Sequence, residues 1–250
     1  HVAGSSLLYN SAGVIFATGS ARELQRNRRS KFYDKEAPLD PEVIVIKTGD
    51  ATLTNFAAHG TVLGAENFLV SGDWPGAFQR ALERRQGGTA LYTNGAEGDL
   101  SPNAPEGKDD FERCEGMGDA LASKVAGLAR GKETPITRLL YIEESAQLPK
   151  AALHFVPSRS VFGLLVINDA AFVCVPGEMT AELGLEIKRR FREKGFGVVA
   201  IVGLTNDHLG YFLTEAQYRK GGYEREVSLF GPGMGKFLIE TYDRLASRIP

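Results

Sequence analysis

The stretch Asn94-Gly95-Ala96-Glu97-Gly98-Asp99-Leu100-Ser101-Pro102-Asn103 follows directly on the short apolar run Thr89-Ala90-Leu91-Tyr92-Thr93. The run predicts a buried strand, and the glycines, acids, serine and proline after it predict a sharp turn. In α/β proteins the loops that follow buried strands often carry the chemistry, because the scaffold positions them rigidly. We therefore take this loop as the point around which the fold and a candidate site are organised.

The residue types in the loop suit either chemistry or plain turn structure. Gly95 and Gly98 allow a positive φ or a close approach of a substrate. Pro102 restricts Ser101 to an extended conformation, which fixes the direction of its hydroxyl. An ordinary turn with a hydrogen bond from the Asp99 side chain to the backbone has the same composition, and this is the commoner case.

The composition is that of a globular chain of 250 residues, which is long enough for one domain with a large core. Lys and Arg number 29 against 31 Asp and Glu, so the formal net charge of −2 argues against a basic nucleic-acid-binding surface. No apolar run approaches the length of a membrane span, and no signal peptide is visible. Nothing in the spacing of Cys114 and Cys174 indicates a metal finger or a disulfide.

Apolar runs and helical periodicities alternate along the chain without a linker or an internal repeat, which predicts a single α/β domain over residues 1–250 with a mixed sheet covered by helices. The basic stretch 22–31 predicts a solvated loop or helix. The predicted strands cover residues 13–17, 42–47, 53–58, 89–93, 139–148, 161–168, 171–175 and 197–204. The predicted helices cover residues 73–85, 117–130 and 233–247, with one more after Glu178 that buries Leu183, Ile187 and Phe191.

Four of the predicted strands end in polar, glycine-containing segments. These segments contain His59, the loop 94–103, Glu178 and the segment 206–211. Taken singly, such a histidine is more often structural, and an acid such as Glu178 near a helix N-terminus is favoured by the helix dipole. Their shared placement at strand ends favours a common site.

Several short motifs resemble those of the neutral, non-lysosomal ceramidases, zinc-dependent amidases that cleave the N-acyl bond of ceramide. The hallmark Gly-Asp-Val-Ser-Pro-Asn of that family resembles residues 98–103, with Leu100 in place of Val. The similar segments follow the same order from about residue 14 to residue 245. They are Asn27-Arg28, Phe56-Ala57-Ala58-His59, Ser71-Gly72-Asp73, Gly98 to Asn103, Pro176-Gly177-Glu178-Met179-Thr180, Gly203-Leu204-Thr205-Asn206 with Tyr211 and Thr214, and Tyr223-Glu224 through Gly231-Pro232.

The resemblance implies a zinc centre with His59, Glu178 and Tyr211 as ligands. Imidazole nitrogen and carboxylate oxygen are ordinary zinc ligands, whereas a tyrosine ligand is unusual and needs its phenol deprotonated or polarised by the metal. By position, the resemblance further implies that Ser101 is the catalytic serine.

Arg28 and Tyr223 match positions that line the active site of the family near the scissile amide. Two mechanisms remain open at this stage. Ser101 attacks the carbonyl itself, which we favour, or a hydroxide activated by zinc attacks while Ser101 positions the substrate or stabilises the oxyanion. In either case Arg28 and Tyr223 would hold the oxyanion or a substrate hydroxyl.

The sequence also departs from the family. The His-Thr-His-Ser-Gly-Pro motif, which carries an upstream zinc ligand, has no counterpart here, and His1 matches it too poorly to be assigned. Either an upstream segment belongs with this chain or the metal site is incomplete. The cysteine-rich stretch after the hallmark hexapeptide and the C-terminal immunoglobulin-like domain of the family are absent as well, so we expect a partial ceramidase-like catalytic domain.

The expected function is hydrolysis of the amide bond of ceramide or a related N-acyl lipid, with Zn²⁺ as cofactor, to a fatty acid and a sphingoid base. The alternatives are hydrolysis of another amide or ester on the same scaffold, and an inactive ligand-binding relative. The expected partner is a lipid or N-acyl amide, reached through peripheral contact with a membrane, and no nucleic acid. By analogy, members of the family are secreted or membrane-associated, and the sequence itself does not define the compartment.

Overall fold

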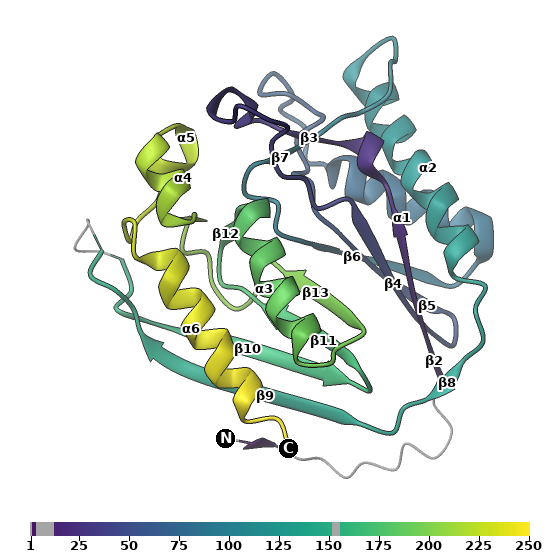
Figure 1. Ribbon diagram of the computed structural model, residues 1–250. Helices are drawn as coiled ribbons and strands as arrows, with labels where there is room; N and C mark the ends of the chain where they lie inside the picture. Colours follow the sequence, from purple (N-terminus) through teal and green to yellow (C-terminus); the bar gives the residue numbers. More distant parts are fainter. Residues whose placement is uncertain (1, 4–12, 152–155) are drawn as a thin grey trace.

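Two five-stranded β-sheets pack face to face, and helices cover the outer face of each sheet (Figure 1). The computed structural model describes residues 2–3, 13–151 and 156–250, so His1 lies outside the described part. The α/β fold class predicted from the sequence is confirmed. The strands form two sheets rather than one central sheet, because short apolar runs reveal strands but not which strands pair.

Antiparallel and parallel pairs occur in both sheets, which makes both of them mixed. The first sheet has the order β6 (Thr89–Asn94), β5 (Ala51–Phe56), β4 (Glu42–Thr48), β2 (Gly13–Ser20) and β8 (Thr134–Pro135). The second has the order β1 (Val2–Ala3), β9 (Leu139–Gln147), β10 (Arg159–Ile167), β11 (Ala170–Cys174) and β13 (Val198–Val202). Two short ribbons join β3 (Gln25–Asn27) to β7 (Leu100–Pro102), and β12 (Glu178–Met179) to β14 (Tyr211–Phe212).

The alternation along β4 shows why the strands are continuously apolar. Val43 and Val45 face the helix layer, whereas Ile44 and Ile46 face the other sheet, where Phe172 of β11 is one of their neighbours in the core. Successive side chains of a strand point to opposite faces, so a strand in an inner layer needs apolar residues at every position. The apolar runs therefore indicate the two-sided burial that the structure has.

Helices α1 (Asp73–Gln86) and α2 (Asp110–Leu128) cover the first sheet, and α3 (Ala181–Glu193) and α6 (Met234–Ser247) cover the second (Figure 1). The short helices α4 (Glu215–Lys220) and α5 (Tyr223–Glu226) precede α6. Helix α2 begins seven residues before its predicted start at residue 117, because the side chain of Asp109 caps it by accepting a hydrogen bond from Glu112 N at 2.8 Å.

The prediction of a solvated loop or helix for the basic stretch 22–31 is only partly right, because five of its ten residues are exposed and four are buried. The stretch contains the 3₁₀ turn η1 (Arg22–Leu24), the strand β3 and the start of the 3₁₀ turn η2 (Ser30–Phe32). Arg29 is only 1% exposed, because a buried carboxylate pairs with it. Charged side chains are usually exposed, but one that pairs with an opposite charge can be buried together with its partner.

Cys114 and Cys174 are both free thiols, in line with the sequence expectation. Within the described residues, no helix has both the length and the apolar character required to cross a bilayer.

Candidate metal centre

The candidate site lies where strand ends from both sheets meet. Strands β5 and β6 run parallel, as do β11 and β13, so each pair ends at the same edge of its sheet. The two edges are tied together, because Asn55 Nδ2 donates to Ile201 O at 2.8 Å and Gly203 N donates to Asn94 O at 3.0 Å. The segments that follow these strands are far apart in the sequence but lie close together in the structure.

His59 follows β5 and is fixed by its own backbone. Its N–H donates to Leu100 O at 3.0 Å, and its carbonyl accepts a hydrogen bond from Trp74 Nε1 at 2.7 Å. The imidazole Nε2 lies 3.5 Å from Gly98 O. Burial, together with the positive charge of Arg28, lowers the pKa of His59, so the ring is neutral at pH 7. Neutral imidazole is the form that binds metals.

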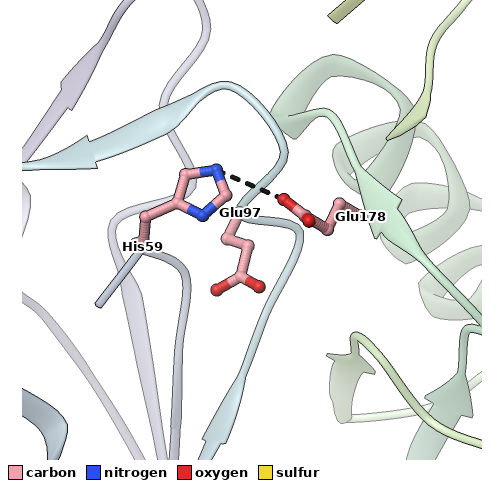
Figure 2. A group of neighbouring side chains, drawn as sticks. All are labelled: His59, Glu97 and Glu178. Atoms are coloured by element: carbon pink, nitrogen blue, oxygen red, sulfur yellow. Dashed lines mark ion pairs between the residues drawn. The ribbon is translucent and has the colours of Figure 1, made fainter. Parts of the chain in front are cut away.

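Glu178 and Tyr211 lie side by side as paired residues of the β12–β14 ribbon. Glu178 Oε2 lies 3.4 Å from His59 Nε2, and Oε1 lies 3.3 Å from His208 Nε2 (Figure 2 shows the pair with His59). The His208 side chain is 67% exposed, whereas that of His59 is 12% exposed. The carboxylate of Glu178 thus has an inner and an outer imidazole neighbour.

The Tyr211 ring lies near the ring of His59, with 6.3 Å between the two ring centroids. Burial, and then hydrogen bonding to Glu178, raises the pKa of the Tyr211 phenol, although Arg28 acts in the opposite direction. The phenol is therefore protonated at neutral pH in the metal-free protein. A cation beside it would favour the phenolate instead.

Glu97 belongs to the same cluster, and the sequence analysis did not single it out. Its carboxylate, the carboxylate of Glu178 and the ring of His59 each offer an atom within 4.8 Å of the others (Figure 2). The only available sequence signal was an acid between two glycines after a buried strand, which also suits a turn. Burial, and then the charge of Glu178, raises the pKa of Glu97 well above its ordinary value.

The chemistry of these donors fits a divalent cation. Glu97 Oε2 and Glu178 Oε2 are buried and accept no hydrogen bond from the described residues. Unpaired buried carboxylate oxygens are costly, and a cation placed among them would remove that cost. The residues could therefore hold a metal ion.

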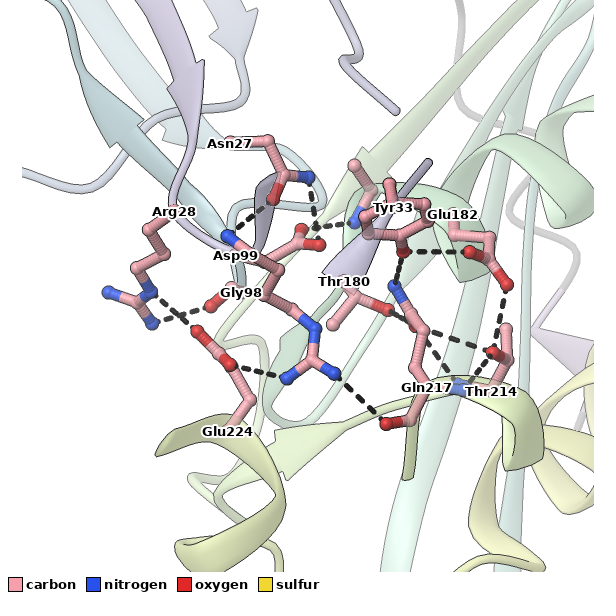
Figure 3. Close-up of polar contacts among 12 residues, drawn as sticks. Asn27, Arg28, Tyr33, Gly98, Asp99, Thr180, Glu182, Thr214, Gln217 and Glu224 are labelled. Atoms are coloured by element: carbon pink, nitrogen blue, oxygen red, sulfur yellow. Dashed lines mark hydrogen bonds and ion pairs between the residues drawn. The ribbon is translucent and has the colours of Figure 1, made fainter. Parts of the chain in front are cut away.

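Arg28 and Tyr223 lie next to the cluster. The Arg28 guanidinium carbon lies 5.6 Å from the centre of the Tyr211 ring and 5.3 Å from that of the Tyr223 ring. Arg28 donates to Glu224 Oε1 and to Gly98 O, both at 2.6 Å (Figure 3). These two acceptors fix the guanidinium beside the loop.

Ser101 lies in β7, directly after the residue that anchors the His59 backbone. It pairs with Arg26 across the β3–β7 ribbon, on the face opposite the buried Leu100 and Pro102. Ser101 is half-buried, and among the described residues its hydroxyl has no hydrogen-bond partner. The structure does not join Ser101 to the carboxylates by a direct contact, and its role stays a prediction.

A buried polar network positions the loop that carries Glu97 (Figure 3). Asp99 accepts hydrogen bonds from Asn27 Nδ2 at 3.0 Å and from the N–H of Ala181, at the start of α3, at 2.8 Å. Gly98 N donates to Met179 O at 2.8 Å. A Cβ at Gly98 would lie 2.8 Å from Glu178 O, so glycine is required for this approach.

The matches to known proteins agree with this architecture. No protein-family model matches the chain. A neutral ceramidase of Mycobacterium tuberculosis is 24% identical, over 94% of this chain and 54% of that protein. A neutral ceramidase of Drosophila melanogaster is 31% identical over 88 residues, which are 33% of this chain and 12% of that protein.

Solved structures give the same answer for the fold. The crystal structure of a neutral ceramidase from Pseudomonas aeruginosa superposes with a TM-score of 0.81 at 18% identity, over 94% of this chain and 52% of that one. A structure of a ceramidase complexed with C2 gives a TM-score of 0.80 at 17% identity, over 94% and 53% of the two chains.

The class that the fold and the matches define is a mixed α/β protein related to hydrolases, with a buried His/Glu cluster that could hold a metal. The chain is a relative of the neutral ceramidase family. It spans about half the length of the Mycobacterium tuberculosis protein and of the solved ceramidases.

Proposed function

We propose that this chain is the metal-holding part of a zinc-dependent amidohydrolase that cleaves the N-acyl bond of ceramide or a related N-acyl lipid. The products would be a fatty acid and a sphingoid base. The observation that carries the proposal is the convergence of His59, Glu178 and Tyr211 beside Arg28, from strand ends of both sheets. The kinship with neutral ceramidases supports the same reaction class.

In this proposal His59, Glu178 and Tyr211 hold the zinc ion. Bound zinc would supply a Lewis acid at the scissile carbonyl. The neutral ring of His59 is in the form that binds metals, and Oε2 of Glu178 accepts no hydrogen bond from the described residues. Because the donor atoms of His59 and Glu178 already lie close together, little rearrangement would be needed for binding.

Arg28 and Tyr223 are proposed to bind the polar groups of the substrate. Burial acts to lower the pKa of Arg28, but hydrogen bonds to Tyr211 and Glu224 outweigh it and raise the pKa, so the guanidinium stays charged. A fixed positive charge stabilises the oxyanion that develops when an amide carbonyl is attacked. Tyr223 is 57% exposed, and its phenol is free to contact a substrate hydroxyl from the solvent side.

Ser101 is proposed as the nucleophile that forms an acyl-enzyme. A serine hydroxyl needs activation by a base or a metal, and the loop places Ser101 within three residues of Gly98, whose carbonyl faces His59. The alternative is that Ser101 orients the substrate while water attacks. The two roles differ in whether a covalent acyl intermediate accumulates, which a burst of product would reveal.

A peripheral contact with a lipid surface is part of the proposal. Phe68, Leu69 and Val70 are strongly exposed, at 90%, 70% and 106%, on the loop that follows His59. Three consecutive exposed apolar side chains are unusual on a monomeric surface and suit insertion among lipid headgroups. When the protein is sedimented with uncharged phosphatidylcholine vesicles, more of the wild type should leave the supernatant than of a variant with serine at all three positions.

The decisive experiment combines metal analysis with hydrolysis. Purified protein should contain about one zinc per chain and release fatty acid from short-chain ceramide. Preference for other N-acyl amides or for esters would identify a different hydrolase on the same scaffold. Stoichiometric metal without turnover of any of these would indicate an inactive ligand-binding relative, and absence of metal binding would refute the proposed centre.

A further inference from the structure

We propose that Glu97 is a ligand of the same metal ion, so that the centre takes its donors from His59, Glu97, Glu178 and Tyr211. This inference rests on the proposed function in one respect, because it assumes that a metal binds beside His59 and Glu178. It goes further in assigning a carboxylate ligand from the loop between β6 and β7. The ligand set inferred from the sequence resemblance does not include Glu97.

The geometry of Glu97 is that of a side chain held ready for an ion. The residue is 1% exposed, and its Oε1 accepts a hydrogen bond from Asn94 Nδ2 at 2.9 Å. Its Oε2 has no partner among the described residues, although the carboxylate contributes an oxygen to the group of mutually adjacent donors with His59 and Glu178. Carboxylate ligands are commonly oriented in this way, by a hydrogen bond to the oxygen that the metal leaves free.

A purely structural role does not account for this arrangement. No described Lys, Arg or His side chain forms an ion pair with Glu97. A second carboxylate, Glu178, lies beside it instead, and two neighbouring buried carboxylates destabilise a protein unless a proton or a cation compensates them. The same hydrogen bond to Asn94 could be made by glutamine without the charge. The acid therefore costs stability that a proton or a bound cation must recover.

His208 is the competing candidate for the additional ligand. Its Nε2 lies 3.3 Å from Glu178 Oε1, but its side chain is 67% exposed and its donor atom does not belong to the mutually adjacent group. Glu97 and His59 lie on the inner side, and Glu178 Oε2 faces His59. The geometry thus favours Glu97 over His208.

A carboxylate in this position also changes which metals the site prefers. With Glu97 the donors comprise one imidazole nitrogen and three oxygens. Oxygen-rich sites accommodate Mn²⁺ better than imidazole-rich sites do, relative to Zn²⁺. We therefore expect Mn²⁺ to bind measurably at this centre, and Glu97→His to shift the preference toward Zn²⁺.

The test measures binding of Zn²⁺ and Mn²⁺ alone to the full chain by titration calorimetry. The variants are Glu97→Gln, His59→Ala and His208→Ala, with the exposed Glu66→Gln as the matched control. Glu97→Gln should weaken Zn²⁺ binding by more than the roughly 10–100-fold that loss of an outer hydrogen-bond partner costs. His208→Ala should lose no more than this amount, because His208 contacts the Glu178 carboxylate from outside, and Glu66→Gln should bind as the wild type does.

Thermal unfolding of the metal-free proteins provides the second readout. Glu97→Gln should unfold at the same or a higher temperature than the metal-free wild type, since it removes an unpaired buried acid. A structural role predicts a lower temperature instead. An oxygen-rich first coordination shell in X-ray absorption spectra of the zinc-loaded wild type, with one oxygen lost in Glu97→Gln, would support the assignment independently.

The outcomes separate this inference from the proposed function. If Glu97→Gln binds zinc as tightly as the wild type while His59→Ala does not bind it, Glu97 is not a ligand and the proposed centre survives. If His208→Ala shows the loss instead, His208 takes the place assigned to Glu97. If the wild type binds no metal, both the centre and the role of Glu97 are refuted.

Discussion

Arg29 Nη1 donates to Glu224 Oε2 at 2.7 Å, and this ion pair joins residues 195 positions apart in a region where both side chains are almost fully buried. The other oxygen of Glu224 holds Arg28, so one carboxylate both fixes the interior and orients a side chain of the candidate site. Glu224 therefore contributes both to the stability of the fold and to the position of Arg28.

Replacement of Glu224 by Gln should destabilise the protein by about 3–5 kcal/mol, because it leaves the buried charge of Arg29 without its partner. It should also weaken hydrolysis, since Arg28 loses an acceptor. Chemical denaturation measures the first effect. Glu226→Gln, at an exposed position two residues further along α5, is the control and should change stability by less than about 0.5 kcal/mol.

The contribution of Glu224 should depend on pH in a defined direction. Burial acts to raise its pKa, but hydrogen bonds from Arg29 and Arg28 outweigh this and lower it below the ordinary value of 4.5. The stabilisation is therefore complete above the unfolded-state pKa and is lost as the pH falls through the folded-state pKa. The difference in unfolding free energy between wild type and Glu224→Gln should shrink below about pH 4.5. A constant difference down to pH 2 would contradict this assignment.

His59→Ala should abolish zinc binding and leave the fold of the metal-free protein intact, because the strand before it is anchored by backbone hydrogen bonds. Zinc content by mass spectrometry and the circular dichroism spectrum test the two parts. Zinc bound as in the wild type would remove His59 from the centre.

Ser101→Ala should lower the hydrolysis rate by about 10³-fold or more while zinc content stays at the wild-type level, as expected for loss of a nucleophile. Ser158→Ala, at an exposed position in the loop before β10, should have no effect. A loss of only about tenfold, without an acyl-enzyme burst in the wild type, would favour a positioning role for Ser101.

Gly98→Ala should disturb the site through packing alone. The added Cβ would lie 2.8 Å from Glu178 O and 2.9 Å from Met179 O, so the loop and β12 must separate. We expect a loss of about 1–3 kcal/mol in stability and weaker metal binding. In contrast, Gly127→Ala in α2 adds a Cβ that meets no atom within 4 Å, and it should stabilise the protein by about 0.5–1 kcal/mol. If Gly98→Ala binds metal with the wild-type affinity, the packing of Gly98 against β12 does not affect the metal centre.

The strand ends that form the site could be predicted because each follows a local apolar run. His59 and Glu178 were singled out in this way as candidates, and in the structure they lie 3.4 Å apart. The division into two sheets could not be predicted, because strand pairing depends on contacts between distant segments. Helix α2 was predicted too short because its first two turns carry mostly polar residues, which hide the apolar periodicity. The helix begins directly after its N-cap, Asp109.

Glu97 and Arg29 show what residue type alone conceals. Each is a charged residue in a polar stretch, where exposure is the usual outcome. Arg29 is buried against Glu224, a charged partner from a distant part of the chain, whereas Glu97 accepts a hydrogen bond from the nearby Asn94 and lies beside Glu178, which comes from a distant segment. Such a partner leaves no trace in the local pattern.

The candidate donors come from both layers of strands, with His59 and Glu97 following strands of the first sheet and Glu178 and Tyr211 following strands of the second. An ion held by all four would act as a cross-link between the sheets. The four donors cannot come together until the two layers have docked, so metal capture would be a late event in folding. Once bound, the ion would slow separation of the layers, and chelation should accelerate unfolding as well as remove the cofactor.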